Sequence, residues 1–300
     1  MTTVYVRERG AVVRKQGERL RVTSGAGELM QIPLADLSQL VLMGNVQLTT
    51  PAAIMLLRAD VDVVFMSYSG TYYGRLNPNA SKYAELRHQQ LRLCDDPKRS
   101  LEVARSVVAG KVANQRVVLL RRAEGFPDIP AAVQGMMTML KQGEQAGDLD
   151  QLRGYEGKAA AYYFAGMRML VPTDWGFEGR KYYPPPDPFN ALLSLSYTLL
   201  RKDVEANLQL VGLDAYLGFF HTLGYDRPAL ALDLMEEFRP TIADTIVLNL
   251  IRQGQITLAD FKSTNQPDTP IRMSDGAAKM LISAYEERLE DKATARGGQT

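Results

Sequence analysis

Cysteine, histidine and tryptophan are scarce in this chain of 300 residues, which has one cysteine, two histidines and one tryptophan. Cys94 has no second thiol with which to form an internal disulfide or a zinc site made of thiolates. We therefore expect a protein of a reducing compartment, the cytoplasm. Any metal ion that it holds must be bound by oxygen and imidazole ligands.

Long apolar runs are absent as well. No window approaches the roughly 18 apolar residues that a membrane span needs. The N-terminal stretch MTTVYVRERG lacks the apolar region of a signal peptide. Because 46% of the residues are hydrophobic, the chain has enough apolar surface for the cores of two domains. The sequence predicts a globular protein with no membrane segment.

A surplus of charge of one sign is also missing, since the formal net charge is +1. Composition alone therefore gives no indication of nucleic-acid binding. The charge is nevertheless uneven along the chain, because residues 86–125 contain four acids and nine bases, which are Arg87, Arg92, Lys98, Arg99, Arg105, Lys111, Arg116, Arg121 and Arg122. A solvated helix face explains this surplus as well as a phosphate-binding surface does.

The N-terminal part of the chain has the pattern of short β-strands. Brief β-rich segments separated by Gly or polar turns lie at 4–6, 11–17, 18–22 and 30–34, and apolar runs typical of buried strands follow at 39–44 and 61–67. Between these runs, TTPAAIMLLRA predicts a helix that starts near Pro51. We expect a small, β-rich dimerisation domain over residues 1–78, because its short strands would expose edges that a second copy could cover.

The pattern changes from period two to period 3.6 near residue 80, after the Gly-, Asn- and Ser-rich segment YSGTYYGRLNPNAS. Residues 79–88 are predicted to be a linker and residues 89–300 a larger, all-α catalytic domain, so the expected fold class is α+β. Helices are expected at 99–123, 130–144, 148–170, 188–211, 214–222, 229–239, 241–253 and 274–291. The proline-rich segment at 173–188 is expected to be an exposed loop, and residues 295–300 a frayed tail.

One histidine and two acids stand out within apolar surroundings. Asp233 and Glu236 are three residues apart in ALDLMEEF, so a helix places both carboxylates on roughly one face. Their burial is costly unless a positive charge lies between them, and a hard divalent cation would supply that charge. His221, which the turn GYDRP would fold back beside them, is a suitable further ligand for Mn²⁺ and a tolerable one for Mg²⁺.

The best candidate for a third acid is Glu156, in the middle of the helix expected at 148–170. It is surrounded by small residues, because Gly157, Ala159 and Ala160 follow it. Small side chains let another helix approach closely. We therefore expect Glu156 to face the same cation.

Each of these residues also has a purely structural interpretation. His221 could be a hydrogen-bonded core histidine, and Asp233 could cap a helix or pair with Arg239. Glu236 could be a solvated ion-pair partner, and Glu156 could pair with a base on its own helix. The spacing of the residues leaves both interpretations open.

Several segments taken together resemble the CRISPR-associated integrase family called Cas-one. They are the stretch from His221 through LALDLMEEFRP, the helix that contains YEG, the segment DPFNALLSLSYTLL, and the run from LVLMGNVQLTT to YSGTYYGRL, with LRHQQL resembling the start of the family's helical domain. The resemblance covers nearly the whole chain. It implies a homodimeric DNA endonuclease and integrase that depends on Mg²⁺ or Mn²⁺. Such an enzyme inserts short fragments of double-stranded DNA into a CRISPR array by 3′-hydroxyl transesterification, together with the small Cas-two protein.

The resemblance also implies roles for the residues singled out above. The metal-binding Glu of the family falls on Glu156 and its His falls on His221. The last acid of the family falls on Glu236, and the additional acid before it falls on Asp233, so these four are the expected catalytic residues. Some members have Asp where this chain has Glu236, whose side chain is one methylene longer.

Other motif residues are expected to support the site or to bind DNA. Asn190 in DPFN and Arg239 in EEFRP lie in family motifs, and we interpret them as supports of the site and not as metal ligands. Duplex DNA must be held by its phosphates. Arg180 and Lys181, beside the aromatic residues of WGFEGRKYY, are candidates for that contact, as are the bases of residues 86–125.

Two other functions remain compatible with these residues. One is a general metal-dependent nuclease that cuts DNA without joining it. The other is a non-catalytic DNA-binding scaffold in which His221 and the acids are structural. Strand transfer conserves a phosphodiester and needs no nucleotide triphosphate, and the phosphate-binding motif GxxxxGK[ST] does not occur in the sequence.

Overall fold

The computed structural model of the protein describes residues 2–35, 37–68, 72–76, 83–181, 184–222, 224–264 and 270–291. Tyr182, Tyr183 and the expected tail at 295–300 lie outside these residues. The chain forms two compact units, one made of Met1–His88 with Glu205–Leu213, and one made of Gln89–Val204 with Asp214–Thr300. The return of Glu205–Leu213 to the first unit is a feature that periodicity in the sequence does not reveal.

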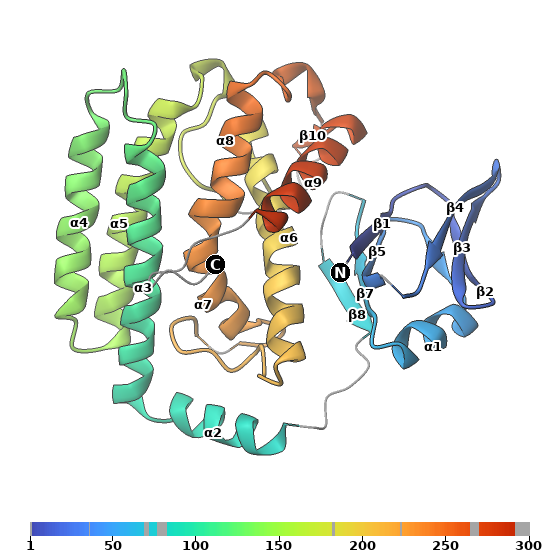
Figure 1. The fold of residues 1–300 in the computed structure, drawn as a ribbon. Coiled ribbons are helices and arrows are strands. Elements are labelled where there is room, and N and C mark those ends of the chain that lie inside the picture. The colour runs from blue at the N-terminus through green and yellow to red at the C-terminus, as the bar shows by residue number, and fades with distance from the viewer. Residues whose placement is uncertain are drawn as a thin grey trace. The chain divides into compact units, whose positions relative to one another are not determined.

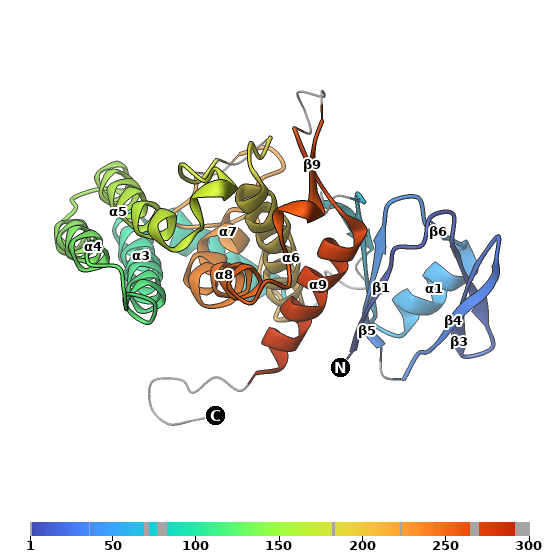
Figure 2. The ribbon, with the colours of Figure 1, turned by 90° about the horizontal axis from the view of Figure 1, so that it is seen from above.

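The first unit contains two sheets and helix α1, as Figures 1 and 2 show. One sheet has the order β1(Thr2–Val6), β5(Leu37–Met43), β7(Asp62–Met66) and β8(Tyr72–Leu76), with only the β7 and β8 pair antiparallel. The other has the order β4(Gly27–Pro33), β3(Arg19–Ser24), β2(Val12–Gln16) and β6(Gln47–Leu48). Helix α1(Thr50–Arg58) shares one apolar core with both sheets, in which Leu20, Leu40 and Leu56 are fully buried. The predicted β-rich N-terminal region is confirmed.

Helices dominate the second unit. After α2(Ala84–Cys94), the helices α3(Pro97–Leu120), α4(Ile129–Glu144) and α5(Leu149–Leu170) lie side by side (Figures 1 and 2), followed by α6(Pro188–Leu210), α7(Ala229–Phe238), α8(Thr245–Arg252) and α9(Asp275–Glu290). The start of α3 is fixed by Asp96, whose side chain accepts hydrogen bonds from the amides of Lys98 and Arg99. None of the helices in the described part of the chain is long and apolar enough to cross a membrane.

The second unit differs from the expected all-α domain in its strands and in the joining of two helices. A hairpin of β9(Phe261–Ser263) and β10(Ile271–Met273) was not predicted. The helices expected at 229–239 and 241–253 form one continuous helical stretch, in which residues 239–244 have the wider turn of a π-helix. Pro240 lies in this turn, since it has no amide hydrogen to give to the regular helix.

The segment expected to be an exposed loop at 173–188 is partly buried. Thr173–Trp175 form a short 3₁₀ turn, and the side chains of Trp175 and Phe177 are buried. The ring of Trp175 lies 5.9 Å from that of Phe261, and the ring of Phe177 lies 4.5 Å from that of Phe189. The prolines prevent a regular helix here, but the aromatic residues before them anchor the segment to the core.

Candidate active site

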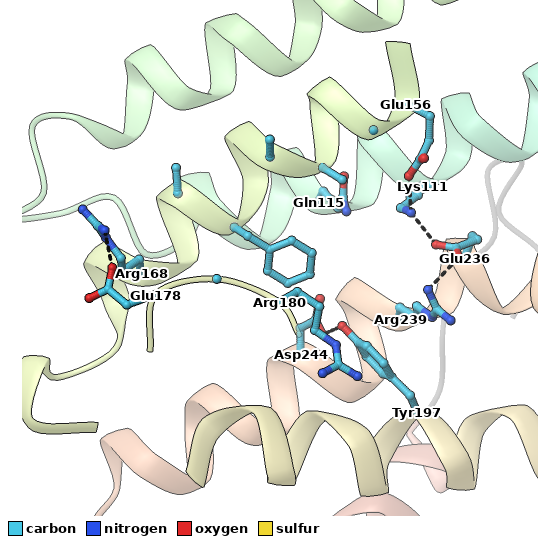
Figure 3. A pocket seen from close by; sticks show the side chains of 16 residues that line it. Lys111, Gln115, Glu156, Arg168, Glu178, Arg180, Tyr197, Glu236, Arg239 and Asp244 are labelled. Atoms are coloured by element: carbon cyan, nitrogen blue, oxygen red, sulfur yellow. Dashed lines mark hydrogen bonds and ion pairs between the residues drawn. The ribbon is translucent and has the colours of Figure 1, made fainter. Parts of the chain in front are cut away.

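Two glutamates from distant parts of the chain meet at one lysine. Nζ of Lys111 on α3 lies 2.5 Å from Oε1 of Glu156 on α5 and 2.6 Å from Oε2 of Glu236 on α7 (Figure 3). The exposed fractions of the three side chains are 11%, 16% and 3%, in that order. The ammonium group therefore lies between the two carboxylates, in largely buried surroundings.

Close packing between helices brings these side chains together. A Cβ atom on Gly110 would lie 2.6 Å from Cδ of Glu237, and one on Gly166 would lie 2.8 Å from Cδ1 of Leu119, both closer than real Cβ atoms come to other groups. These two glycines therefore let α3 lie against α7 and against α5 without a clash. Gly157, which the sequence suggested for this role, has no neighbour within 4 Å of its Cβ position and lines a cavity instead.

His221 does not lie on a helix, and the helix expected at 214–222 is wrong. The backbone amides of Phe219 and Phe220 donate to Oδ2 of Asp233 at 2.6 and 2.9 Å, and the amide of His221 donates to Oδ1 at 2.8 Å. Asp233 is fully buried on α7. Since these amides bind a carboxylate, they are not available to the carbonyl groups of a regular helix.

Asp233 also orients the ring of His221. Nδ1 of His221 lies 2.6 Å from Oδ1 of Asp233, and because a carboxylate only accepts hydrogen bonds, Nδ1 must carry the proton. The other ring nitrogen, Nε2, lies 3.9 Å from Oε1 of Glu236. The structure thus places His221 next to Glu236, and it places Asp233 behind the imidazole as a positioning residue.

A cavity of about 640 Å³ opens beside the two glutamates. Figure 3 shows its polar lining, which includes Lys111, Gln115, Glu156, Arg180, Tyr197, Glu236, Arg239 and Asp244. His221 and Asp233 are not among the residues that line it. Four bases and four carboxylates line this space, so the cavity offers cationic groups to an anionic ligand and carboxylates to a cation.

The charges next to Glu236 decide its ionisation. Nη1 of Arg239 donates to Oε1 of Glu236 at 2.6 Å. Burial acts to raise the pKa of Glu236, but Arg239 and Lys111 outweigh it and hold the pKa at about 2. Burial acts to lower the pKa of Lys111, but Glu236 and Glu156 raise it above its usual value. At neutral pH, Glu236 is a carboxylate and Lys111 an ammonium ion.

A buried carboxylate in the lining of the cavity connects α5 and α6 with the π-helical turn. Asp244, the last residue of the π-helical turn, accepts a hydrogen bond of 2.7 Å from Tyr163 on α5 and one of 2.6 Å from Tyr197 on α6. Burial raises the pKa of Asp244, and burial and the carboxylate raise the pKa of each tyrosine well above 10. The guanidinium of Arg239 lies 4.7 Å from the ring of Tyr197, so this network also holds Arg239 in place.

Asn190 organises the segment that carries Arg180. Its buried side chain accepts hydrogen bonds from Nη1 of Arg180 at 2.9 Å and from the amide of Lys181 at 3.0 Å. It donates to the carbonyl of Gly179 and to Oδ2 of Asp187. Asn190 therefore sets the position of Arg180 at the cavity, while Lys181 remains exposed.

Some of the bases at 86–125 are buried or bonded within the protein, and others are exposed. Lys111 pairs with the buried glutamates, and Nη2 of Arg105 donates to the carbonyl of Ala146 at 2.5 Å. Both side chains therefore make contacts within the protein. Arg116 and Arg121 are exposed. Arg87 and Arg122 are half-buried and donate to the carbonyl of Gly212 and to Oδ1 of Asn249. Part of the surplus is thus structural and part is exposed to solvent.

The donor set suits a hard divalent cation, although a lysine lies within it. Two carboxylates and an imidazole with a free Nε2 are ligands that Mn²⁺ accepts and Mg²⁺ tolerates. In the described residues, the side chains of His, Cys, Asp and Glu form no group of three or more that could hold a metal ion in their present positions. The ammonium of Lys111 lies where a cation between Glu156 and Glu236 would have to lie. The residue types fit such an ion, but in this arrangement an ammonium group lies between the two carboxylates.

Solved structures of several proteins have the same fold. A CAS1 protein from Thermotoga maritima has a TM-score of 0.85 at 22% identity, with 95% of this chain and 89% of that chain covered. A chain of a Cas6-RT-Cas1–Cas2 complex has a TM-score of 0.86 at 27% identity, with 97% of this chain and 32% of that chain covered.

Several relatives share more of their sequence with this chain than the solved structures do. CRISPR-associated endonuclease Cas1 3 of Thermus thermophilus is 39% identical over 292 residues, which are 96% of this chain and 85% of the relative. CRISPR-associated endonuclease Cas1 1 of Moorella thermoacetica is 36% identical over 304 residues, which are 97% of this chain and 87% of the relative. The family model described as CRISPR associated protein Cas1 matches residues 4–287. Since this match spans nearly the whole chain, the resemblance seen in the sequence is confirmed, and the chain belongs to the Cas1 family.

Proposed function

We propose that this chain is a metal-dependent DNA endonuclease and integrase of CRISPR adaptation, which inserts short DNA fragments into a CRISPR array by 3′-hydroxyl transesterification. The observation that carries the proposal is the meeting of Glu156 and Glu236 at a single cation position, with His221 held beside them by Asp233. The relatives named CRISPR-associated endonuclease Cas1 support the nuclease chemistry.

Glu156, His221 and Glu236 would hold Mg²⁺ or Mn²⁺. When bound, the ion would polarise a phosphodiester and stabilise the negative charge of the in-line transition state. Asp233 keeps the proton of the imidazole on Nδ1, so Nε2 is free to act as a ligand. Arg239 keeps Glu236 ionised and fixes one of its oxygens. Because no covalent enzyme intermediate is required, the site needs no nucleophilic side chain.

DNA phosphates would be met by the basic side chains at and near the cavity. Arg180 and Arg239 both lie on its wall, each within about 5 Å of the ring of Tyr197, at 5.1 and 4.7 Å. Lys181 follows Arg180 and is exposed. Guanidinium groups bind phosphate oxygens through charge-assisted hydrogen bonds. Double-stranded DNA is the ligand that we propose for these bases.

Two protein partners belong to the proposal. The chain would form a homodimer, because β4 ends its sheet and exposes Leu29 and Met30, whose exposed fractions are 40% and 39%. It would also work with a Cas2 protein. The solved Cas6-RT-Cas1–Cas2 complex, which contains a chain of the same fold, supports this partner.

A strand-transfer assay tests the proposed function. Purified protein with Mn²⁺ should join an oligonucleotide with a free 3′-hydroxyl into supercoiled plasmid, and it should not join an oligonucleotide whose 3′ end is blocked. Glu156→Ala and His221→Ala should abolish joining while the circular dichroism spectrum stays unchanged.

The alternatives give different results in the same assay. A general nuclease would cut the plasmid without joining either oligonucleotide. A non-catalytic scaffold would do neither, and in it His221→Ala would unfold or aggregate, because a buried carboxylate would lose its partner. Either result would overturn the proposed function.

A further inference from the structure

Lys111 is a buried base in the position that the proposed metal ion needs. It lies on the apolar face of α3, near the buried residues Val108 and Val112. Its ammonium is within hydrogen-bonding distance of one carboxylate oxygen from Glu156 and one from Glu236. A lysine on a solvated helix face would have neither the burial nor two carboxylate partners.

We propose that Lys111 is an internal counter-cation that competes with the divalent metal ion for Glu156 and Glu236, and thereby sets how tightly this chain binds the metal. The inference rests on the proposed function, since it concerns the same site. It adds a residue and a role that the three metal ligands do not include.

Burial of the carboxylates makes such a counter-cation necessary. The side chain of Glu236 has an exposed fraction of 3%, and taking a carboxylate out of water costs several kcal/mol unless a positive charge is at hand. Arg239 contacts one oxygen of Glu236 and Lys111 contacts the other. Without metal, Lys111 and Arg239 together balance the charges of the two carboxylates.

A divalent ion would change this balance. The metal, Lys111 and Arg239 would place four positive charges against two negative ones in a site with little water, so the ammonium would be repelled. Lys111 lines the cavity of about 640 Å³ and has room to withdraw into it. There it would join Arg180 on the wall that faces the proposed DNA phosphates. Metal binding therefore includes the cost of breaking two ion pairs.

A different role for Lys111 predicts the opposite effect. If the ammonium stayed on Glu156 and Glu236 after the metal had bound, it would hold them in place for the ion. Removing it would then weaken metal binding, as the loss of partners of metal ligands does in other sites. The direction of the change in metal affinity thus separates competition from support.

The test is Mn²⁺ binding to the full chain without DNA, measured from the electron paramagnetic resonance signal of free Mn²⁺. Lys111→Met removes the charge and keeps much of the apolar stem. We expect its Kd for Mn²⁺ to be about tenfold lower than that of the wild type, which corresponds to about 1.4 kcal/mol. Lys158→Met is the matched control. It removes one positive charge from an exposed position on α5 and should leave the Kd unchanged.

Thermal unfolding provides a second readout. In EDTA, Lys111→Met should melt at a lower temperature than the wild type, because two buried carboxylates lose their shared cation. Saturating Mn²⁺ should raise its melting temperature by more than it raises that of the wild type. If Lys111→Met does not fold, Lys111→Gln takes its place, since the amide still donates a hydrogen bond while the charge is absent. For Lys111→Gln we again expect a lower Kd for Mn²⁺, a lower melting temperature in EDTA and a larger rise with Mn²⁺.

The outcomes separate this inference from the proposed function. If wild-type protein binds Mn²⁺, if Glu156→Gln and Glu236→Gln weaken that binding, and if Lys111→Met binds Mn²⁺ no more tightly, Lys111 is not a competitor and the proposed metal site stands. If neither the wild type nor Lys111→Met binds Mn²⁺, both the inference and the proposed function fail.

Discussion

Asp233 accepts hydrogen bonds from the backbone and from the ring of His221 through one oxygen, Oδ1, which lies 2.8 Å from the amide nitrogen and 2.6 Å from Nδ1. Its other oxygen accepts from the amides of the two residues before the histidine. A single buried carboxylate thus determines both the path of the irregular segment and the tautomer of a proposed ligand.

Asp233→Asn should damage metal binding and stability together. An asparagine has one acceptor oxygen, so either the amides of Phe219 and Phe220 or the two groups of His221 lose their partner. We expect the Kd for Mn²⁺ to rise about 10- to 100-fold, and the free energy of unfolding to fall by about 1–3 kcal/mol. Titration with Mn²⁺ and urea unfolding measure these effects. Asp226→Asn, at an exposed turn position, should change neither.

The low pKa of Glu236 predicts a defined loss of stability in acid. The pKa is about 2 in the folded chain against 4.5 as its ordinary value, so this carboxylate stabilises the fold fully above pH 4.5. That stability is lost as the pH falls from 4.5 towards 2, and it is on the order of 3 kcal/mol, since each pKa unit corresponds to about 1.36 kcal/mol. In EDTA, Glu236→Gln should be less stable at pH 7 and should lose less stability over this range. The free energy of unfolding of each protein is measured by urea unfolding at several pH values. If it falls equally for both proteins between pH 4.5 and pH 2, the prediction is contradicted.

The tyrosines on Asp244 should contribute strongly to stability. Tyr163→Phe and Tyr197→Phe each leave one oxygen of a fully buried carboxylate without its donor. We expect each substitution to lower the free energy of unfolding by about 1–3 kcal/mol. Tyr162→Phe is the control, because Tyr162 neighbours Tyr163 on α5 but has an exposed fraction of 43%. Equal effects of Tyr162→Phe and Tyr163→Phe would show that the carboxylate is not responsible.

DNA binding should depend on salt through the exposed bases. If Lys181 contacts one phosphate, Lys181→Gln should weaken binding to all sequences alike, and the slope of log K against log salt should become shallower by about 0.9. Fluorescence anisotropy with a labelled duplex at several salt concentrations measures the slope. Lys141→Gln, at an exposed position on α4, serves as the control. A flat salt response of the wild type would argue against an electrostatic contact with phosphates.

The edge strand β4 provides a test of the proposed dimer. Sedimentation velocity at micromolar concentration should show a dimer for the wild type. Met30→Lys places a charge on the exposed face of this edge and should shift the equilibrium towards the monomer. Lys15→Gln, at an exposed position on β2, which β3 separates from β4 in the same sheet, should not. A stable wild-type monomer would rule out this role of the sheet.

Local patterns in the sequence were sufficient for most elements but not for those set by distant contacts. Strands β5 and β7 and the helices α3, α5 and α6 follow from apolar periodicity and from Gly, Pro and Asp at their ends. The helix expected at 214–222 failed because the amides there bind Asp233, a residue beyond the segment itself. Periodicity does not show such a competitor.

The sequence likewise indicated some residues of the candidate site and missed others. Glu156, His221 and Glu236 were singled out as polar residues in apolar surroundings, and the structure brings them together. Lys111 was counted among the bases of a solvated or phosphate-binding face, although its position between Val108 and Val112 was the signal that it is buried. Asp244 and its two tyrosines gave no signal, since their contact depends on how α5, α6 and a π-helical turn pack.

The π-helical turn at Arg239–Asp244 has a consequence for the phase of the helix. Each residue advances an α-helix by about 100°, and a π-turn absorbs roughly one extra residue without ending the helix. If the same residues formed a regular α-helix, all that follows would be rotated by about that angle relative to Glu236. Asp244 would then turn away from its tyrosines while Arg239 kept its ion pair. The wider turn therefore sets the angle between the two ends of one uninterrupted helix, so that Glu236 and Asp244 both reach the lining of the same cavity.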